Sequence, residues 1–221
     1  MAKRLGAGSV PALVGIIGAA VVIVGDIVTS LSLPGYSPIR DSVSSLAWTE
    51  LGWLQTICFL AMALLLVIFV TGLFFTLRRA PAFYAGITLL GLCAFVLALI
   101  AAFHMEHPGA PQIDARIHEI ASYSLGLLFP VAILSLSPSL KSTPGWRSVF
   151  IYTLIAGALA FGLILGAIFG RQEGWFGLYE RLIILNALVW VEVVAIHWLR
   201  LLLRQSPGTK SVQSTPKGGG S

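Results

Sequence analysis

Six long apolar segments dominate this chain and constrain its fold more than any other feature. They cover approximately residues 10–31, 52–77, 82–103, 117–136, 146–170 and 178–203. A helix needs about 20 apolar residues to cross a bilayer. Because lipid offers no partner for a backbone N–H group, whereas a helix satisfies its own, each segment is predicted to be a transmembrane helix.

The composition supports the same interpretation. Of the 221 residues, 57% are hydrophobic and only 10% are charged, whereas soluble domains carry roughly 25% charged residues. We therefore expect an all-α polytopic membrane protein with a six-helix bundle at residues 10–203. Residues 1–9 are predicted to form a cytoplasmic N-terminus. Residues 204–221 are predicted to be a disordered cytoplasmic tail, whose final GGGS resembles an expression linker.

The basic residues predict the orientation. Ten of the fourteen Lys and Arg residues fall on one side of a six-span topology, and cationic loops stay on the cytoplasmic side. Both termini are therefore expected in the cytoplasm, with the protein in the cytoplasmic (inner) membrane of a bacterium. The acidic residues gather in or beside the opposite loops. The net charge of +5 follows from this asymmetry, so no nucleic-acid partner is needed to explain it.

A polar stretch, AAFHMEHPGAPQIDARIHEIAS at residues 101–122, interrupts the apolar pattern. A hairpin here brings His104 and His118 to a similar depth. Together with His107 and Asp41 they form a reasonable zinc ligand set. The spacing matches no named zinc motif, however, and hydrogen-bonding histidines are the other interpretation.

Two further outer segments carry charge. Asp41 or Ser42 is expected to cap a short interfacial helix, and the alternative is that Arg40 and Asp41 turn inward over the bundle. Before and in the sixth segment, Arg171 and Arg181 lie close to acidic residues. They either surround an anion together with Arg40 or form intramolecular salt bridges that fix the outer loops.

Two carboxylates, Asp26 and Glu192, lie inside apolar segments. An ionisable group at that depth is costly and marks a functional-site hypothesis. The two residues sit at different depths and are not expected to touch. For Glu192, protonation or pairing with hydroxyl and backbone groups is the alternative.

The pattern YSPIRDSVSSL, the His-bearing outer turn and the segment GLYERLIILNALVWVEVVAIHWLRL resemble DUF998, a family of prokaryotic six-span membrane proteins of unknown function. The resemblance covers roughly residues 10–203. It implies a fold and the position of a site but no reaction. The polar set that it implies is Arg40, Asp41, Ser42, Ser45, His118, Glu180 and Arg181.

The first functional hypothesis is a binding or accessory protein with an outward-facing polar pocket. Its ligand would be a lipid headgroup, an apolar cofactor such as a carotenoid or quinone, or a partner membrane subunit. The expected pocket residues are Arg40, Asp41, Ser42, Ser45, His104, His118, Glu119, Arg171, Glu180 and Arg181.

The alternative is an intramembrane metal-dependent hydrolase that acts on a lipid-like substrate. Zinc bound by His104, His107, His118 and Asp41 would supply a nucleophilic hydroxide. Ser42 or Ser45 would contact the substrate or stabilise its oxyanion. The sequence leaves open whether the protein is an enzyme.

Overall fold

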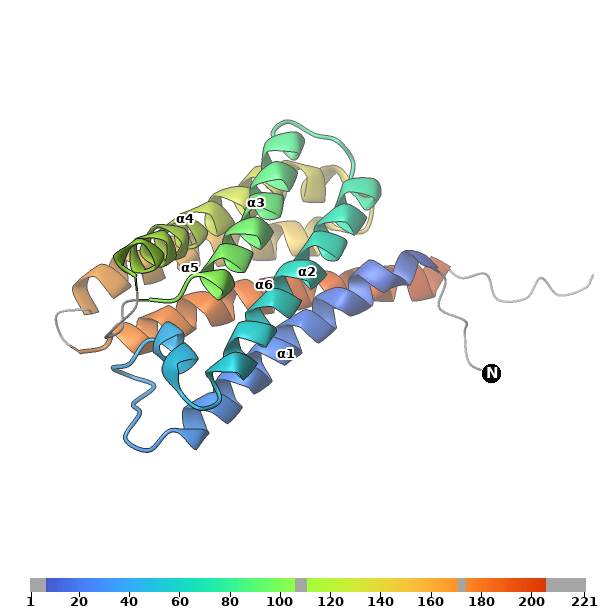
Figure 1. The fold of residues 1–221 in the computed structure, drawn as a ribbon. Helices are drawn as coiled ribbons and strands as arrows, with labels where there is room; N and C mark the ends of the chain where they lie inside the picture. Colours follow the sequence, from blue (N-terminus) through green and yellow to red (C-terminus); the bar gives the residue numbers. More distant parts are fainter. Residues whose placement is uncertain (1–6, 106–110, 171–173, 206–221) are drawn as a thin grey trace, which may run out of the picture.

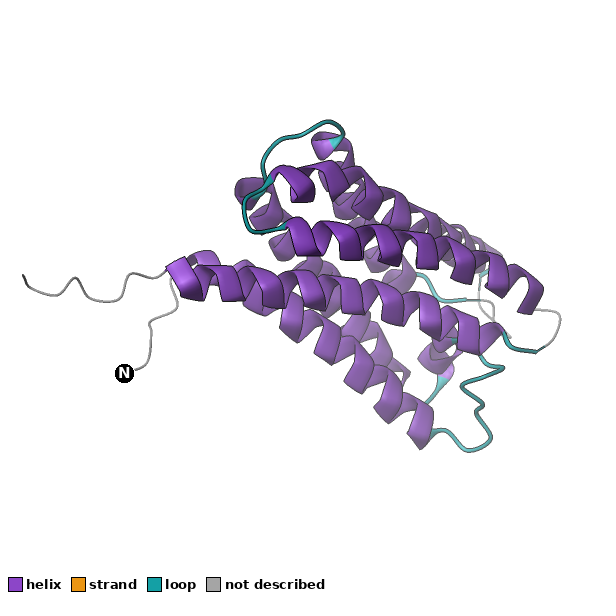
Figure 2. Ribbon diagram, turned by 180° about the vertical axis from the view of Figure 1, so that it is seen from behind, coloured by secondary structure: helices purple, strands orange, loops and turns teal. Residues whose placement is uncertain are grey.

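The computed structural model describes residues 7–105, 111–170 and 174–205, and this part of the chain forms a bundle of long helices (Figure 1). No strand occurs in these ranges (Figure 2). Two short 3-10 helices accompany the bundle, η1 (Ala7–Ser9) and η2 (Val43–Trp48). The long helices are α1 (Val10–Ser32), α2 (Gly52–Thr76), α3 (Phe83–Ala102), α4 (Gln112–Ser142), α5 (Arg147–Gly170) and α6 (Phe176–Gln205).

The six long helices form a closed ring. Each packs against the next along the chain, and α6 returns to pack against α1. The start of α1 and the end of α6 lie at the same end of the bundle (Figure 1). The opposite end, which we call the distal end, holds the α1–α2 connection with η2, the end of α3 and the starts of α4 and α6 (Figures 1 and 2).

All six long helices are long and apolar enough to cross a membrane. Their outer faces carry large apolar side chains such as Leu31, Phe75 and Phe169, which are 83%, 79% and 74% exposed. Such surfaces are stable in lipid and unfavourable in water. The predicted multi-pass membrane fold is therefore confirmed, while the membrane that holds it and the side each end faces stay predictions.

Helix α4 is longer than its apolar segment. The sequence predicted residues 117–136, whereas the helix runs over Gln112–Ser142. A segment defined by consecutive apolar residues ends where polar residues begin, whereas the helix continues through them. Asp114 in the first turn and Lys141 in the last turn also match the polarity of the helix dipole. The extra turns bring polar side chains of α4 into the distal end.

Glycines allow close contacts between the helices. Gly15 and Gly18 of α1 lie against side chains of α2 or α6, and Gly157 and Gly166 of α5 lie against α4 and α6. A Cβ atom at any of these positions would overlap its neighbour. Gly162 differs, because a Cβ there would meet open space.

The predicted short helix of the α1–α2 connection is η2. Ser42 is its N-cap, with Oγ accepting a hydrogen bond from the Ser45 N–H at 3.2 Å, as the sequence suggested. The helix is of the 3-10 type, with three residues per turn. Its buried residues Val43 and Leu46 anchor it on the bundle.

Candidate functional site

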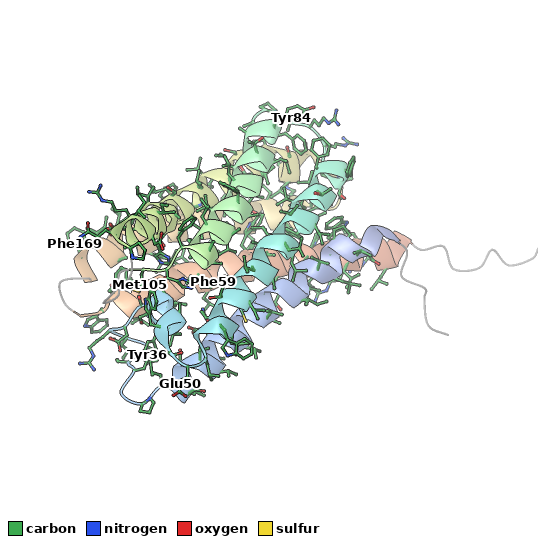
Figure 3. All side chains as sticks on the ribbon, viewed as in Figure 1. Tyr36, Glu50, Phe59, Tyr84, Met105 and Phe169 are labelled. Carbon is green, nitrogen blue, oxygen red and sulfur yellow. The ribbon has the colours of Figure 1, made fainter. Side chains whose placement is uncertain are left out.

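A cavity of about 440 Å³ lies at the distal end, between η2, the segment after α3 and the starts of α4 and α6. Met105, labelled in Figure 3, forms part of its wall. The wall combines a guanidinium, two carboxylates, an imidazole and several hydroxyls with apolar side chains. Its residues are Ser42, Ser44, Met105, Gln112, Ala115, Arg116, His118, Glu119, Ser122, Tyr123, Phe176 and Glu180.

His118 is a buried polar side chain in the wall of this cavity. It is only 7% exposed, and both ring nitrogens have partners. Nδ1 lies 2.7 Å from the carbonyl oxygen of Phe103, and Nε2 lies 3.0 Å from the Ser44 Oγ. A carbonyl oxygen only accepts hydrogen bonds, so Nδ1 carries the proton. In the neutral ring Nε2 is then an acceptor, and the Ser44 hydroxyl donates to it.

The partner of Nδ1 is provided by the end of a helix. Phe103 is the C-cap of α3, and the last carbonyls of a helix have no partner within it. The Nδ1–H group of His118 donates a hydrogen bond to one such carbonyl, that of Phe103. The end of α3 therefore fixes both the tautomer and the orientation of the imidazole.

Glu180 connects α6 to η2. Its Oε2 accepts a hydrogen bond from the Val43 N–H at 2.7 Å. Val43 lies between Ser42 and Ser44, which both line the cavity together with Glu180. One carboxyl group thus fixes the start of η2 and also forms part of the cavity wall.

A second polar cluster, which we call the Arg181 clamp, lies on the α1 side of α6. The Arg181 guanidinium donates to both carboxylate oxygens of Asp26, at 3.2 and 3.3 Å. It also donates to the carbonyl oxygens of Pro38 and Asp41, each at 3.0 Å, and to the Tyr36 hydroxyl. One side chain of α6 thereby joins α1 to the α1–α2 connection.

Tyr36 and Gly177 complete the clamp. The Tyr36 hydroxyl donates to the Ser42 carbonyl at 2.8 Å, and burial raises the pKa of the phenol, so the group stays protonated. Gly177 lies directly against the Asp41 carbonyl, where a Cβ atom would collide with backbone. The clamp side and the cavity side of the connection are therefore linked through residues 41–43.

The predicted site residues separate into groups. Ser42, His118, Glu119 and Glu180 line the cavity. Arg181 belongs to the clamp, so its side chain follows the intramolecular alternative rather than the anion-binding one.

Residues Arg40 and Asp41 do not turn inward over the bundle. The Arg40 side chain is exposed, and the Asp41 carboxylate accepts a hydrogen bond from the Ser37 N–H in its own loop at 2.7 Å. Only the backbone carbonyl of Asp41 reaches the clamp.

His104 and Ser45 lie outside the cavity wall. The His104 ring packs 5.3 Å from that of Trp48, and its Nε2 lies 3.4 Å from the Thr56 Oγ1. The Ser45 hydroxyl donates to the Ser42 carbonyl. His107 and Arg171 fall outside the described residues.

The two intramembrane carboxylates differ. Asp26 pairs with Arg181, a contact that the sequence did not predict. Glu192 is half-buried and, as predicted, does not meet Asp26. No side-chain hydrogen bond or ion pair joins Glu192 to another residue of the described ranges.

The described residues do not fit the predicted zinc site. Within them, no three or more His, Cys, Asp or Glu side chains gather in a way that would hold a metal ion. Both nitrogens of His118 and the carboxylate of Asp41 have other partners, and His107 lies outside the described residues. The members of the predicted ligand set that the structure describes therefore share no common centre.

Sequence reasoning missed Ser44, Arg116 and Ser122. Ser44 is next to Ser45, but neighbouring residues of a 3-10 helix lie on different sides, so the Ser44 side chain lines the cavity and that of Ser45 does not. Arg116 precedes the predicted start of the fourth segment. A polar stripe at helical spacing was the available signal: Gln112, Arg116, Glu119, Ser122 and Tyr123.

Comparison with known proteins gives a family. No curated protein and no solved structure matches the chain significantly. The model of the family described as "Protein of unknown function (DUF998)" matches residues 16–197, which reach from α1 into α6. This match confirms the resemblance carried by the segments around Arg40 and Arg181. The chain therefore belongs to the DUF998 family.

Proposed function

We propose that this protein binds a membrane lipid by its polar headgroup in the distal cavity. The observation that carries the proposal is the mixed wall of that cavity, in which Arg116, Glu119 and Ser122 face the same space as Met105 and Phe176. Its volume of about 440 Å³ falls in the range of small-molecule sites, roughly 300–1,000 Å³. An amphipathic ligand satisfies both parts of the wall.

The chemistry of the wall favours a phospholipid. A guanidinium such as that of Arg116 suits phosphate oxygens, with which it forms paired charge-assisted hydrogen bonds. The Glu119 carboxylate accepts from an ammonium or hydroxyl group on the same headgroup. An apolar cofactor such as a carotenoid or quinone would remove these charged groups from water without giving them partners, which is costly.

The position of the cavity favours a lipid of the outer leaflet. The basic residues Arg78, Arg79, Lys141 and Arg147 lie in loops or helix ends opposite the distal end. Positive residues mark the cytoplasmic side. We therefore assign the protein to the bacterial cytoplasmic membrane, with the cavity on the extracytoplasmic face.

Filling the cavity tests the proposal. Ser122→Phe places a ring in the wall of the cavity, whereas Ile120→Phe, two residues away on α4, changes a side chain that is 66% exposed. Native mass spectrometry of the protein released from nanodiscs should show bound phospholipid in the wild type and in Ile120→Phe, and its loss in Ser122→Phe. Equal lipid retention by the two variants would place the lipid elsewhere and overturn the proposal.

A charge variant tests the headgroup chemistry. Arg116→Gln keeps a polar side chain but removes the cation from the cavity. Because a hydrogen bond to a charged group contributes about 1.5–3 kcal/mol, the affinity for phosphatidylglycerol should fall roughly 10-fold or more. The affinity for diacylglycerol, which lacks phosphate, should stay unchanged. A parallel loss of both lipids would contradict phosphate recognition by Arg116.

A further inference from the structure

We infer that Ser44 and His118 form a nucleophile–base pair that cleaves a carboxylic ester of the lipid bound in the distal cavity. The inference rests on the proposed function, because both residues line the same cavity. It adds a reaction and a substrate class to that site.

The geometry is that of an activated serine. The Ser44 Oγ lies 3.0 Å from His118 Nε2, and His118 Nδ1 lies 2.7 Å from the Phe103 carbonyl oxygen. An activated nucleophile is recognised by a base within hydrogen-bond reach and by a third group that orients the base. Here these three groups come from η2, α4 and the end of α3, so the fold brings together distant parts of the chain.

The direction of the two hydrogen bonds matches general-base catalysis. The Phe103 carbonyl holds the proton on Nδ1, so the free lone pair of Nε2 points at the Ser44 hydroxyl. When His118 takes the serine proton, the resulting imidazolium faces the C-terminal end of α3. A helix C-terminus carries partial negative charge and stabilises a cation there.

The neighbouring serine does not share this arrangement. The Ser42 hydroxyl lies 3.6 Å from the Met105 sulfur, and its oxygen accepts from the Ser45 N–H. Neither partner is a base. Among the serines that line the cavity in the described ranges, Ser44 is the one that bonds to an imidazole.

The reaction balances with water as the co-reactant. The Ser44 oxygen attacks the ester carbonyl carbon, and its proton passes to His118 Nε2. The tetrahedral intermediate expels the alcohol portion of the lipid, which takes that proton from Nε2. Water, deprotonated by His118, then attacks the acyl-serine ester, releases the fatty acid and returns the proton to the Ser44 oxygen. Arg116 and Gln112 in the same wall supply N–H donors for the headgroup phosphate and the negatively charged oxygen of the intermediate.

A covalent probe tests the nucleophile. We would treat the full-length protein in nanodiscs with a fluorophosphonate and locate the adduct by peptide mass spectrometry. The adduct is expected on Ser44 and absent from Ser44→Ala. Ser32→Ala, which changes an exposed serine bonded to the Val28 carbonyl at the end of α1, should react like the wild type. Absence of an adduct on Ser44 in the wild type would overturn the inference.

A thiol variant tests the base without removing buried His118. In Ser44→Cys the imidazole should favour the thiolate, which is the reactive form. Iodoacetamide should therefore alkylate Ser44→Cys at least 10-fold faster than Ser42→Cys, whose side chain has no base beside it. The native Cys58 and Cys93 are buried and give little background. Equal rates for the two variants would contradict activation by His118.

Turnover and binding are then measured on the same samples. Nanodiscs of dioleoyl phosphatidylglycerol should release oleic acid, and Ser44→Ala should reduce the rate at least roughly 100-fold, the lower range for loss of proton-transfer catalysis. Native mass spectrometry should show that Ser44→Ala still binds the lipid. Lipid binding without an adduct or turnover would overturn the inference and leave the proposed function standing. An adduct on Ser44 without lipid binding would overturn both the lipid-ester assignment and the proposed function.

Discussion

Arg181 directs every nitrogen of its guanidinium to acceptors within the protein. Nε and the two terminal nitrogens reach Asp26, three backbone carbonyls, Ser30 and Tyr36. A guanidinium with its donors engaged in this way is not available to an external anion. The cation of the distal cavity is therefore Arg116, and the role of Arg181 is to hold the α1–α2 connection in place.

Removal of the Arg181 charge should destabilise the fold. The Arg181 and Asp26 side chains are partly buried, at 17% and 23% exposed. Because loss of one partner of a fully buried ion pair costs about 3–5 kcal/mol, a cost of roughly 1–3 kcal/mol is expected for this pair. Arg181→Gln should therefore lower the midpoint of thermal unfolding in nanodiscs. Combined with Asp26→Asn, it should cost at least ~1 kcal/mol less than the sum of the two single changes. Additive effects would show that the pair is not coupled.

Single residues also show where sequence reasoning reached its limit. Asp26 and Glu192 looked alike, as carboxylates within apolar segments, yet only Asp26 has a charged partner among the described residues. The difference depends on how each helix is rotated and which helix lies beside it. For the same reason the sequence identified His118 and Glu180 as polar site residues but did not predict the serine beside His118.

At the scale of elements, Gly177 sets how closely α6 approaches the α1–α2 connection. The Leu178 N–H donates to the Ile39 carbonyl at 2.9 Å, and a Cβ on Gly177 would overlap the Asp41 carbonyl group. Because both groups are backbone, neither moves without shifting the connection. The contact between Gly177 and Asp41 lies beside the clamp. Because Asp41 directly precedes Ser42, the N-cap of η2, this contact also connects the clamp to the cavity wall.

Two glycine substitutions should therefore have opposite effects. Gly177→Ala should lower the thermal midpoint and weaken phospholipid retention, since the α1–α2 connection must move. Gly162→Ala, where a Cβ meets open space in the interior of α5, should raise stability by about 0.5–1 kcal/mol through helix propensity. Thermal unfolding and native mass spectrometry of the two variants provide the measurement. A Gly177→Ala protein that matches the wild type in both would contradict the close packing of α6 on the connection.

Helix positions were predictable because lipid imposes a length and a composition on every span. The predicted segments for α1 and α2 agree with the observed helices within one residue at each end. Sequence could not give the extra turns of α4, since their residues are polar. It also could not show that η2 is a 3-10 helix, in which Ser44 rather than Ser45 bonds to His118.

At the scale of the whole molecule, the orientation in the membrane is open to a direct test. Glu50 lies at the distal end (Figure 3), and Pro81 lies in the α2–α3 connection at the opposite end. In intact cells a membrane-impermeant maleimide should label Glu50→Cys, whereas Pro81→Cys should react only after the cells are broken. The reverse pattern would place the cavity on the cytoplasmic side and contradict the orientation predicted from the basic residues.

Sequence patterns could not predict that the six helices form a closed ring. Apolar segments show that there are spans but not which spans are neighbours, because lipid-facing and helix-facing residues are both apolar. The cavity needs α4 and α6 to approach η2 from two sides, and the clamp needs α6 beside α1. Both sites therefore follow from packing between segments that are far apart along the chain.

The clamp has a consequence for the synthesis of the protein. Arg181 follows Asp26 by 155 residues, so at ~5–20 residues per second the ribosome needs about 8–30 s to deliver the partner of Asp26. During that interval the Asp26 carboxylate in the first span has no counter-ion, and the α1–α2 connection lacks its hydrogen bonds to Arg181. Helix α6, which is synthesised long after α1, thus supplies the counter-ion of Asp26, and a chain that stops before α6 leaves this carboxylate unpaired.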